Sequence, residues 1–290
     1  MSTPRSWMFV PGSDERKINK IDSFHPDVFI FDLEDAVANH EKENARQLVV
    51  DSLQHHPEKL KYIRINSYES PYFLDDLNTV VAPGLAGIVL PKAEAANHIK
   101  WIDRMVSEKE KENGIEAGKI KIVPLIESAL GLYHSYEIAN SSTRVERLAF
   151  GAIDYTLDIH AELTKDGEEI LYARSHLVAV SRAAGIGAPI DTPYVDIKDS
   201  EGFLYETRYI KSLGFQGKLV IHPSQISLVN QVFTLNREDI DKALEIVEAY
   251  ENALVNDLGV LQFKGKMVDL PVVEKARRIV EMAGLLKSNS

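Results

Sequence analysis

The chain alternates short apolar runs with longer amphipathic segments. Two of the runs end in a carboxylate, because residues 122–126 lead to Glu127 and residues 148–153 lead to Asp154. A short apolar run beside a helical segment is typical of a strand that is buried on both faces of a parallel sheet. Consecutive parallel strands end at the same edge of a sheet, so we expect Glu127 and Asp154 to be neighbours in space.

The same alternation repeats from residue 7 onward. It predicts strands at residues 7–10, 28–32, 62–66, 87–92, 122–127, 148–154, 188–190 and 218–222. It predicts helices at residues 15–21, 41–53, 71–80, 94–109, 133–140, 168–184 and 200–213. Eight such units over about 230 residues predict an α/β fold, a (β/α)₈ TIM barrel. A doubly wound open sheet is the alternative, although it rarely needs eight parallel strands.

A second part of the chain follows the predicted barrel. Apolar residues near helical spacing predict a helix over residues 237–257, and Pro271 marks the first turn of a last helix. We therefore divide the chain into a catalytic barrel at residues 1–235 and a C-terminal helix–loop–helix extension at residues 236–290. An extension outside a complete barrel usually serves assembly or covers an active site.

Most of the predicted strands end in a polar residue. These residues are Asp32 followed by Glu34 and Asp35, Arg64 with Asn66, Lys92, Glu127, Asp154 and His222. In a barrel they form a ring at the C-terminal face, where barrel enzymes carry their chemistry. Two converging carboxylates repel unless a cation lies between them, and carboxylates with water are the ligands that Mg²⁺ prefers. The sequence therefore predicts a Mg²⁺ site at Glu127 and Asp154.

Composition and charge narrow the class of protein. The net charge of −11 argues against nucleic acid or an anionic membrane as the main partner. No apolar run approaches the roughly 20 residues of a membrane span, and residues 1–6 lack the apolar region of a signal peptide. Cysteine is absent, which removes disulfides, thiolate metal ligands and thiol nucleophiles. We expect a cytoplasmic protein that binds neither nucleic acid nor membrane.

A series of motifs in a characteristic order resembles the citrate lyase β subunit and its relatives in the HpcH/HpaI aldolase superfamily. The motifs are Arg5-Ser6 with Phe9-Val10-Pro11-Gly12, Asp32-Leu33-Glu34-Asp35-Ala36-Val37, Arg64-Ile65-Asn66, Leu90-Pro91-Lys92, Pro124-Leu125-Ile126-Glu127, Phe150-Gly151 with Asp154, Asp166-Gly167-Glu168-Glu169 through Tyr172-Ala173-Arg174-Ser175, and Ile221-His222-Pro223-Ser224-Gln225. Each motif alone is weak, but together they span nearly the whole chain.

The resemblance implies a TIM barrel that forms a homotrimer or hexamer. It implies Mg²⁺ held by Glu127 and Asp154, and Arg64 gripping the carboxylate of an α-keto acid. The segment at residues 265–269 matches a lid of CoA-dependent relatives, in which the residue matching Asp269 reaches a neighbouring subunit's site. Asp269 is then the candidate acid that protonates the enolate left by cleavage.

The activity that the resemblance implies is Mg²⁺-dependent cleavage of a carbon–carbon bond. A citryl thioester, either citryl-CoA or citryl-carrier protein, would give oxaloacetate and an acetyl thioester by retro-Claisen chemistry. Implied partners are the citrate lyase α subunit and an acyl carrier protein. One alternative keeps the site and changes the acid, giving a citramalyl-CoA or malyl-CoA lyase or a malate-synthase-like enzyme. Another is a non-catalytic subunit that binds acyl thioesters.

Each residue of the predicted site also has a plainer interpretation. Glu127 would satisfy backbone donors at a helix N-terminus, and Asp154 would be a helix N-cap. Arg64 would form a structural ion pair with Glu34 or Asp35.

Residues around the predicted ligands leave similar alternatives open. Glu34, Asp35 and Lys92 either orient metal-bound water from behind or serve only in ion pairs. Asp269 would be an ordinary helix cap in front of Pro271.

The remaining candidates are basic residues. Arg5, Lys17 and Lys20 would contact CoA phosphates or would be surface charges. His222 is either a base or a hydrogen-bonded residue at a strand end. His160 stands where many relatives have glycine, and the sequence does not assign it a role.

Overall fold

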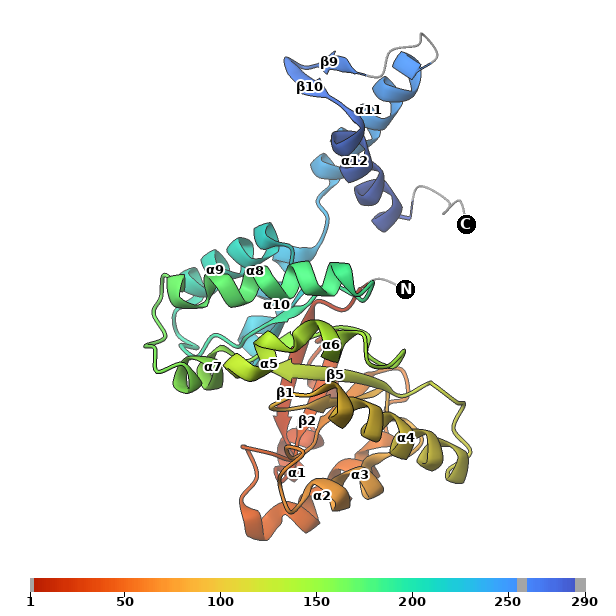
Figure 1. Cartoon of the computed structure of the whole chain (residues 1–290), viewed down its shortest axis with the longest axis vertical. Coiled ribbons are helices and arrows are strands. Elements are labelled where there is room, and N and C mark those ends of the chain that lie inside the picture. Colours follow the sequence, from red (N-terminus) through yellow and green to blue (C-terminus); the bar gives the residue numbers. More distant parts are fainter. Residues whose placement is uncertain (1–2, 255–259, 285–290) are drawn as a thin grey trace. The chain divides into compact units, whose positions relative to one another are not determined.

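The computed structural model describes residues 3–254 and 260–284. Within them, eight parallel strands close a barrel in sequence order, with β1 paired to both β2 and β8 (Figure 1). The strands are β1 (Ser6–Pro11), β2 (Val28–Asp32), β3 (Leu60–Arg64), β4 (Gly87–Leu90), β5 (Lys121–Ile126), β6 (Ala149–Phe150), β7 (Ile190–Asp191) and β8 (Gly217–Val220). The predicted TIM barrel is confirmed.

Helices follow the strands and cover the outside of the barrel. They are α1 (Glu15–Ile18), α2 (Lys42–Leu53), α3 (Phe73–Val80), α4 (Ala96–Glu112), α5 (Ala129–Tyr133), α6 (Ser135–Ala139), α7 (Ala152–Asp158), α8 (Glu168–Ala183), α9 (Ser200–Leu213) and α10 (Pro223–Phe233). The helix predicted at residues 133–140 is two short helices, α5 and α6. Helix α10 was not predicted. No helix among residues 3–254 and 260–284 is long and apolar enough to cross a membrane.

Two layers of apolar side chains hold the barrel together. One layer fills the lumen and includes Trp7, Ile30, Val123 and Leu219. The other lies between the strands and the helices, where side chains such as Phe31 pack. Strands buried on both faces read as continuous apolar runs, which is why these short strands were predictable.

Strand β6 is shorter than the sequence predicted. The apolar run at residues 148–153 contains the whole strand, the turn at Gly151 and the start of α7, so Asp154 lies in the first turn of a helix. Space requires a glycine at the turn, because a Cβ on Gly151 would lie 2.5 Å from Oε2 of Glu127. Periodicity cannot separate strand from helix in so short an apolar run.

The described residues from 234 onward form a compact unit separate from residues 3–233. The unit contains α11 (Arg237–Leu254), the antiparallel pair β9 (Leu261–Phe263) and β10 (Lys266–Val268), and α12 (Leu270–Met282). Both predicted helices are present, and residues 255–257 of the first lie outside the described residues. The hairpin was not predicted, although Lys264 and Gly265 at its turn both have positive φ, which two-residue hairpins favour.

Candidate active site

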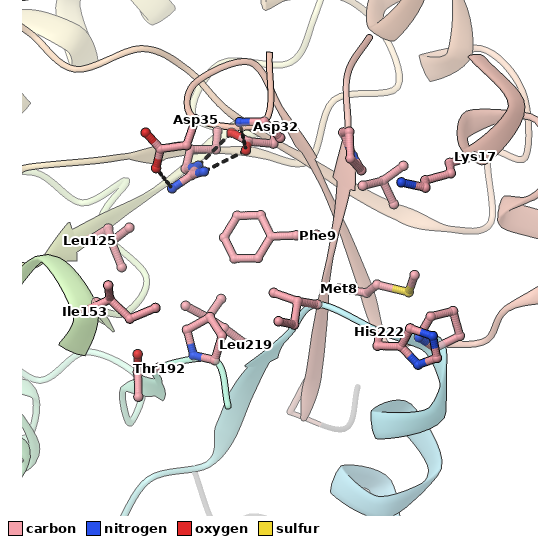
Figure 2. Close-up of a pocket in the computed structure, with 18 of the residues that line it drawn as sticks. Met8, Phe9, Lys17, Asp32, Asp35, Leu125, Ile153, Thr192, Leu219 and His222 are labelled. Atoms are coloured by element: carbon pink, nitrogen blue, oxygen red, sulfur yellow. Dashed lines mark hydrogen bonds and ion pairs between the residues drawn. The ribbon is translucent and has the colours of Figure 1, made fainter. Parts of the chain in front are cut away.

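A cavity of about 690 Å³ opens at the C-terminal ends of the barrel strands. Its lining includes Asp35, Arg64, Glu127 and Asp154, which the sequence predicted to lie together. Phe9 projects into the middle of the cavity (Figure 2). All of these residues belong to the barrel unit.

Arg64 is the centre of one side of the cavity. It ends β3 directly beside Asp32, which ends β2, and the two form a bidentate pair with Nε–Oδ1 at 2.7 Å and Nη2–Oδ2 at 2.6 Å. Its Nη1 lies 3.1 Å from Glu34 Oε2 and 3.3 Å from Asp35 Oδ2. The ring of Phe9 packs on the guanidinium, with 4.9 Å between its centroid and Cζ. The expected ion pairs with Glu34 and Asp35 are therefore present, together with one to Asp32 that was not predicted.

Asp32 was predicted as a polar strand end, but its pairing with Arg64 was not predicted. Besides pairing with Arg64, its two oxygens accept hydrogen bonds from the backbone N–H groups of Glu34 at 2.9 Å and Ala36 at 3.1 Å. It thus fixes the turn after β2 and the direction of the guanidinium together. A carboxylate and an arginine at the ends of consecutive strands were the available signal, but their shared register was not visible in the sequence.

Charge pairing sets the protonation of this side. Burial would lower the pKa of Arg64, but hydrogen bonds with Asp32 and the charges of Glu34 and Asp35 raise it, so the guanidinium stays charged. Burial raises the pKa of Glu34 to about 7, against the attraction of Arg64 and with the help of Asp35. The group therefore titrates near neutral pH.

Glu127 follows β5 on the other side of the cavity and is only 4% exposed. Its Oε1 accepts a hydrogen bond of 2.7 Å from the backbone N–H of Lys92. Burial, together with the charges of Glu34 and Asp154, raises the pKa of Glu127 to about 8. A bound cation would lower the pKa of such a buried carboxyl group and so keep it ionised.

Lys92 contributes through its backbone more than through its side chain. Its φ of +48° lies in the left-handed region, which a non-glycine residue seldom adopts. This conformation accompanies the bond from its amide to Glu127. The side chain is half exposed, with Nζ 4.0 Å from Glu34 Oε1.

Asp154 approaches the cavity from the first turn of α7. The N-cap of α7 is Gly151, so the alternative that Asp154 caps this helix is wrong. The turn is held by the N–H of Ala152, which donates to Thr192 Oγ1 at 3.0 Å.

The donor set suits a cation that accepts few protein ligands. Among residues 3–254 and 260–284, no three His, Cys, Asp or Glu side chains gather as a metal cage. Two carboxylates with water and substrate oxygens fit Mg²⁺, which retains several waters. Glu127 and Asp154 both line the cavity, and the charge of Asp154 acts on Glu127.

Basic residues extend the cavity. Lys17, Lys20 and His222 are among its lining residues, and Lys17 also pairs with Asp14 at 3.3 Å. Arg5 is not among them, because it precedes β1 and binds Asp27 through Nε at 2.8 Å and Nη2 at 2.9 Å. Two of the three residues predicted for CoA therefore reach the cavity.

Two other candidates have local partners. His222 Nδ1 lies 2.7 Å from Ser224 Oγ, as the hydrogen-bonded interpretation expects. Asp269 lies in the C-terminal unit as the N-cap of α12 and accepts a hydrogen bond from Val272 N–H at 3.3 Å. His160 follows α7 with a φ of +57° and is not a lining residue of the cavity.

A paired guanidinium and two acidic residues line one cavity at the C-terminal ends of the barrel strands, where barrel enzymes have their active sites. The family described as HpcH/HpaI aldolase/citrate lyase matches residues 5–223, and a carbon–carbon bond lyase family of the TIM-barrel fold matches residues 170–285. The chain belongs to the HpcH/HpaI aldolase/citrate lyase family, and it is a carbon–carbon lyase.

Individual relatives match over almost the whole length. The citrate lyase subunit beta of Haemophilus influenzae is 40% identical, over 98% of this chain and 98% of the relative. A mitochondrial citramalyl-CoA lyase of Rattus norvegicus is 33% identical, over 98% of this chain and 87% of the relative. A crystal structure of the protein CitE from Mycobacterium tuberculosis, in complex with magnesium, acetoacetate and coenzyme A, is 27% identical with a TM-score of 0.80 and covers 98% of each chain.

Proposed function

We propose that the chain is a Mg²⁺-dependent lyase that cleaves a citryl thioester to oxaloacetate and an acetyl thioester. The observation that carries the proposal is a single cavity lined by Arg64, Glu127 and Asp154. Kinship supports the choice of substrate, because a citrate lyase β subunit is 40% identical over nearly the full length.

Glu127 and Asp154 would hold the metal ion. The mutual repulsion that helps to raise the pKa of Glu127 is the interaction that a cation would reverse. When bound, Mg²⁺ supplies positive charge to the substrate's hydroxyl and carboxylate oxygens. The amide of Lys92 keeps one oxygen of Glu127 fixed meanwhile.

Arg64 would grip the carboxylate next to the bond that breaks. Asp32 already occupies Nε and Nη2, so the edge around Nη1 is the one to receive substrate. Of the two carboxylates there, Asp35 is 65% exposed and can be displaced, whereas Glu34 is buried. Glu34 and Lys92 would then orient water near the ion.

Asp269 of a neighbouring subunit would supply the proton that completes the reaction. The substrate hydroxyl loses its proton as it becomes the keto group, and breaking the carbon–carbon bond leaves its electron pair on the acetyl carbon, which takes up one proton to become a methyl group. We expect Asp269→Asn to leave keto-acid binding intact and to slow turnover strongly. Asparagine is as good an N-cap as aspartate, so α12 should be preserved. Normal turnover in this variant would remove Asp269 from the mechanism.

The thioester would extend along the basic part of the cavity. Lys17 and Lys20 would contact phosphates of CoA or of a carrier-protein arm. Arg5 is paired with Asp27 and is not in the cavity lining, so we leave it out of this assignment.

We further propose a cytoplasmic homotrimer or hexamer, with a citrate lyase α subunit and an acyl carrier protein as partners. Exposed apolar side chains on the barrel helices support an assembly: Tyr133, Leu157 and Tyr172 are 81%, 73% and 69% exposed. Light scattering of the purified chain would measure the number of subunits.

A second enzymatic function is cleavage of citramalyl-CoA to pyruvate. The citramalyl-CoA lyase relative supports it, as do the apolar residues Phe9, Leu125 and Leu219 in the cavity lining. Cleavage of malyl-CoA would differ only in the keto acid at this position, which would be smaller than pyruvate. A non-catalytic acyl-thioester-binding subunit is less well supported, because Arg64, Glu127, Asp154 and Asp269 are all present.

The decisive experiment is to incubate the purified chain and Mg²⁺ with citryl-CoA, citramalyl-CoA and malyl-CoA and to measure the keto acid formed. We expect the highest kcat/KM with citryl-CoA. Glu127→Ala should lose both Mg²⁺ binding and cleavage. Full activity after removal of metal with a chelator would contradict the metal site, and thioester binding without cleavage would favour the non-catalytic alternative.

A further inference from the structure

A buried ammonium group lies behind the Arg64 side of the cavity. Lys42, the first residue of α2, is 5% exposed and does not line the cavity. Its Nζ donates to the carbonyls of Leu33 and Glu34, both at 2.8 Å, and to Asn66 Oδ1 at 2.7 Å. An ammonium has three N–H donors, so all of them are used, and all three acceptors are neutral oxygens.

The acceptors belong to the two segments that build the guanidinium clamp. Leu33 stands between Asp32 and Glu34, and both of these neighbours contact Arg64. Asn66 follows Arg64 by two residues beyond the end of β3. Lys42 therefore ties the turn that carries the carboxylates to the segment that carries the guanidinium.

A second layer of bonds holds Asn66 in place. Its backbone N–H and its Nδ2 both donate to Asp76 Oδ2, at 2.8 Å and 2.6 Å. Asp76 is fully buried and accepts a bond of 2.7 Å from Arg46 Nε. Lys42 and Arg46 lie one helical turn apart on α2, so a single helix face supports both layers.

We propose that Lys42 is a positioning residue for binding of the α-keto acid. The inference rests on the proposed function of Arg64 as the carboxylate clamp. Lys42 fixes the distance between Glu34 and Arg64, and hence the Nη1 edge that receives the substrate. It has no bond to Glu127 or to Asp154, so it acts on keto-acid affinity and not on Mg²⁺ affinity.

The chain offers a matched control in Lys61. Lys61 lies near the start of β3, is fully buried, and donates from Nζ to the backbone carbonyls of Leu53, at 2.9 Å, and His55. It is not in the cavity lining. Like Lys42→Met, Lys61→Met removes a buried ammonium group and leaves backbone carbonyls without a hydrogen-bond donor. Unlike Lys42→Met, it does not affect the residues around Arg64.

Calorimetric titration of pyruvate and of oxaloacetate, each in saturating Mg²⁺, tests the inference. We expect Lys42→Met to raise Kd by about 10- to 100-fold, as loss of an outer supporting residue commonly does. Lys61→Met should stay within about 3-fold of wild type, and Mg²⁺ affinity should change by no more than that in either variant. Wild-type keto-acid affinity in Lys42→Met, or an equal loss in Lys61→Met, would overturn the inference.

Hydrogen exchange gives a readout that needs no substrate. The amides of Leu33, Glu34 and Ala36 are bonded to Arg64 O and to the carboxylate of Asp32. They should exchange faster in Lys42→Met, or in the milder Lys42→Gln if the first variant does not fold, and not in Lys61→Met. Unchanged exchange would overturn the inference. Failure of wild type to bind either keto acid would instead reject the proposed function, and exchange alone would then decide whether Lys42 positions the clamp.

Discussion

The two sides of the cavity differ in how their charges are balanced. On the β2–β3 side, three carboxylates surround Arg64, and Lys42 supports the turn behind them. On the other side, burial, followed by the charges of Glu34 and Asp154, raises the pKa of Glu127 to about 8. One side is electrostatically paired when the chain folds, whereas the other keeps unpaired negative charge that the proposed Mg²⁺ would balance.

The difference means that the Arg64 side is arranged before substrate binds, whereas the Glu127 side changes its charge balance when an ion binds. A paired guanidinium has a fixed direction before substrate arrives, so little reorganisation is needed when the carboxylate binds. An acidic pair stores repulsion that an ion relieves, so part of the binding free energy of the ion is repulsion removed. Removing a charged side chain should therefore destabilise the fold on the Arg64 side and stabilise the metal-free fold on the Glu127 side.

The largest effect should follow from Arg64→Met, which turns the paired side into a second acidic cluster. Removing one partner of a buried ion pair typically destabilises a protein by about 3–5 kcal/mol. We expect a loss of that order in urea unfolding, together with loss of keto-acid binding. Arg64→Lys is the control, and it should recover part of the stability without the binding, because lysine cannot bond bidentately. Wild-type stability in Arg64→Met would contradict the comparison.

A smaller effect of opposite sign should follow from Glu127→Gln. Glutamine keeps the acceptor for Lys92 N–H and removes a carboxylate whose pKa is raised to about 8. Each unit of pKa corresponds to about 1.4 kcal/mol, so metal-free protein at pH 8 should gain about 1 kcal/mol or more. Thermal unfolding with and without Mg²⁺ measures this. A variant that Mg²⁺ stabilises as much as it does wild type would show that Glu127 is not a ligand.

The same buried carboxylates should also give metal-free wild type a pH-dependent stability. Folded Glu127 and Glu34 have pKa values of about 8 and 7, above the ordinary 4.5, so between these limits the folded chain holds protons that the unfolded chain has lost. Their contribution to stability is therefore present at low pH and lost as pH rises from about 5 to 8. Urea midpoints at several pH values should show the decline, and saturating Mg²⁺ should flatten it. An equal slope in Glu127→Gln would exclude Glu127 as a source.

The barrel was predictable because its strands are buried on both faces and end in polar residues. The same rule assembled Arg64, Glu127 and Asp154, since parallel strands deliver their ends to one face. The prediction of a strand was wrong over residues 151–154, because the apolar run continues from β6 through Gly151 into α7. Apolar character reports burial, and burial is common to both elements.

The supporting residues were not predictable for a different physical reason. Lys42 lies on a helix where lysine is usually exposed, and only the folded chain brings Leu33, Glu34 and Asn66 around its ammonium. Asp32 looked like one polar strand end among several, and its bidentate pairing depends on the register of β2 against β3. Such interactions depend on geometry between distant segments, which local sequence patterns do not contain.

The close approach of Gly151 to Glu127 has a genetic consequence. The φ of Gly151 is −111°, which other residues adopt freely, so contact with Glu127 is what excludes a side chain: an added Cβ would lie 2.5 Å from Oε2 and 2.8 Å from Cβ of Glu127. Every missense change in that codon adds a Cβ and pushes the carboxylate aside. Codon 151 should therefore be among the least tolerant in a mutational scan selected for lyase activity.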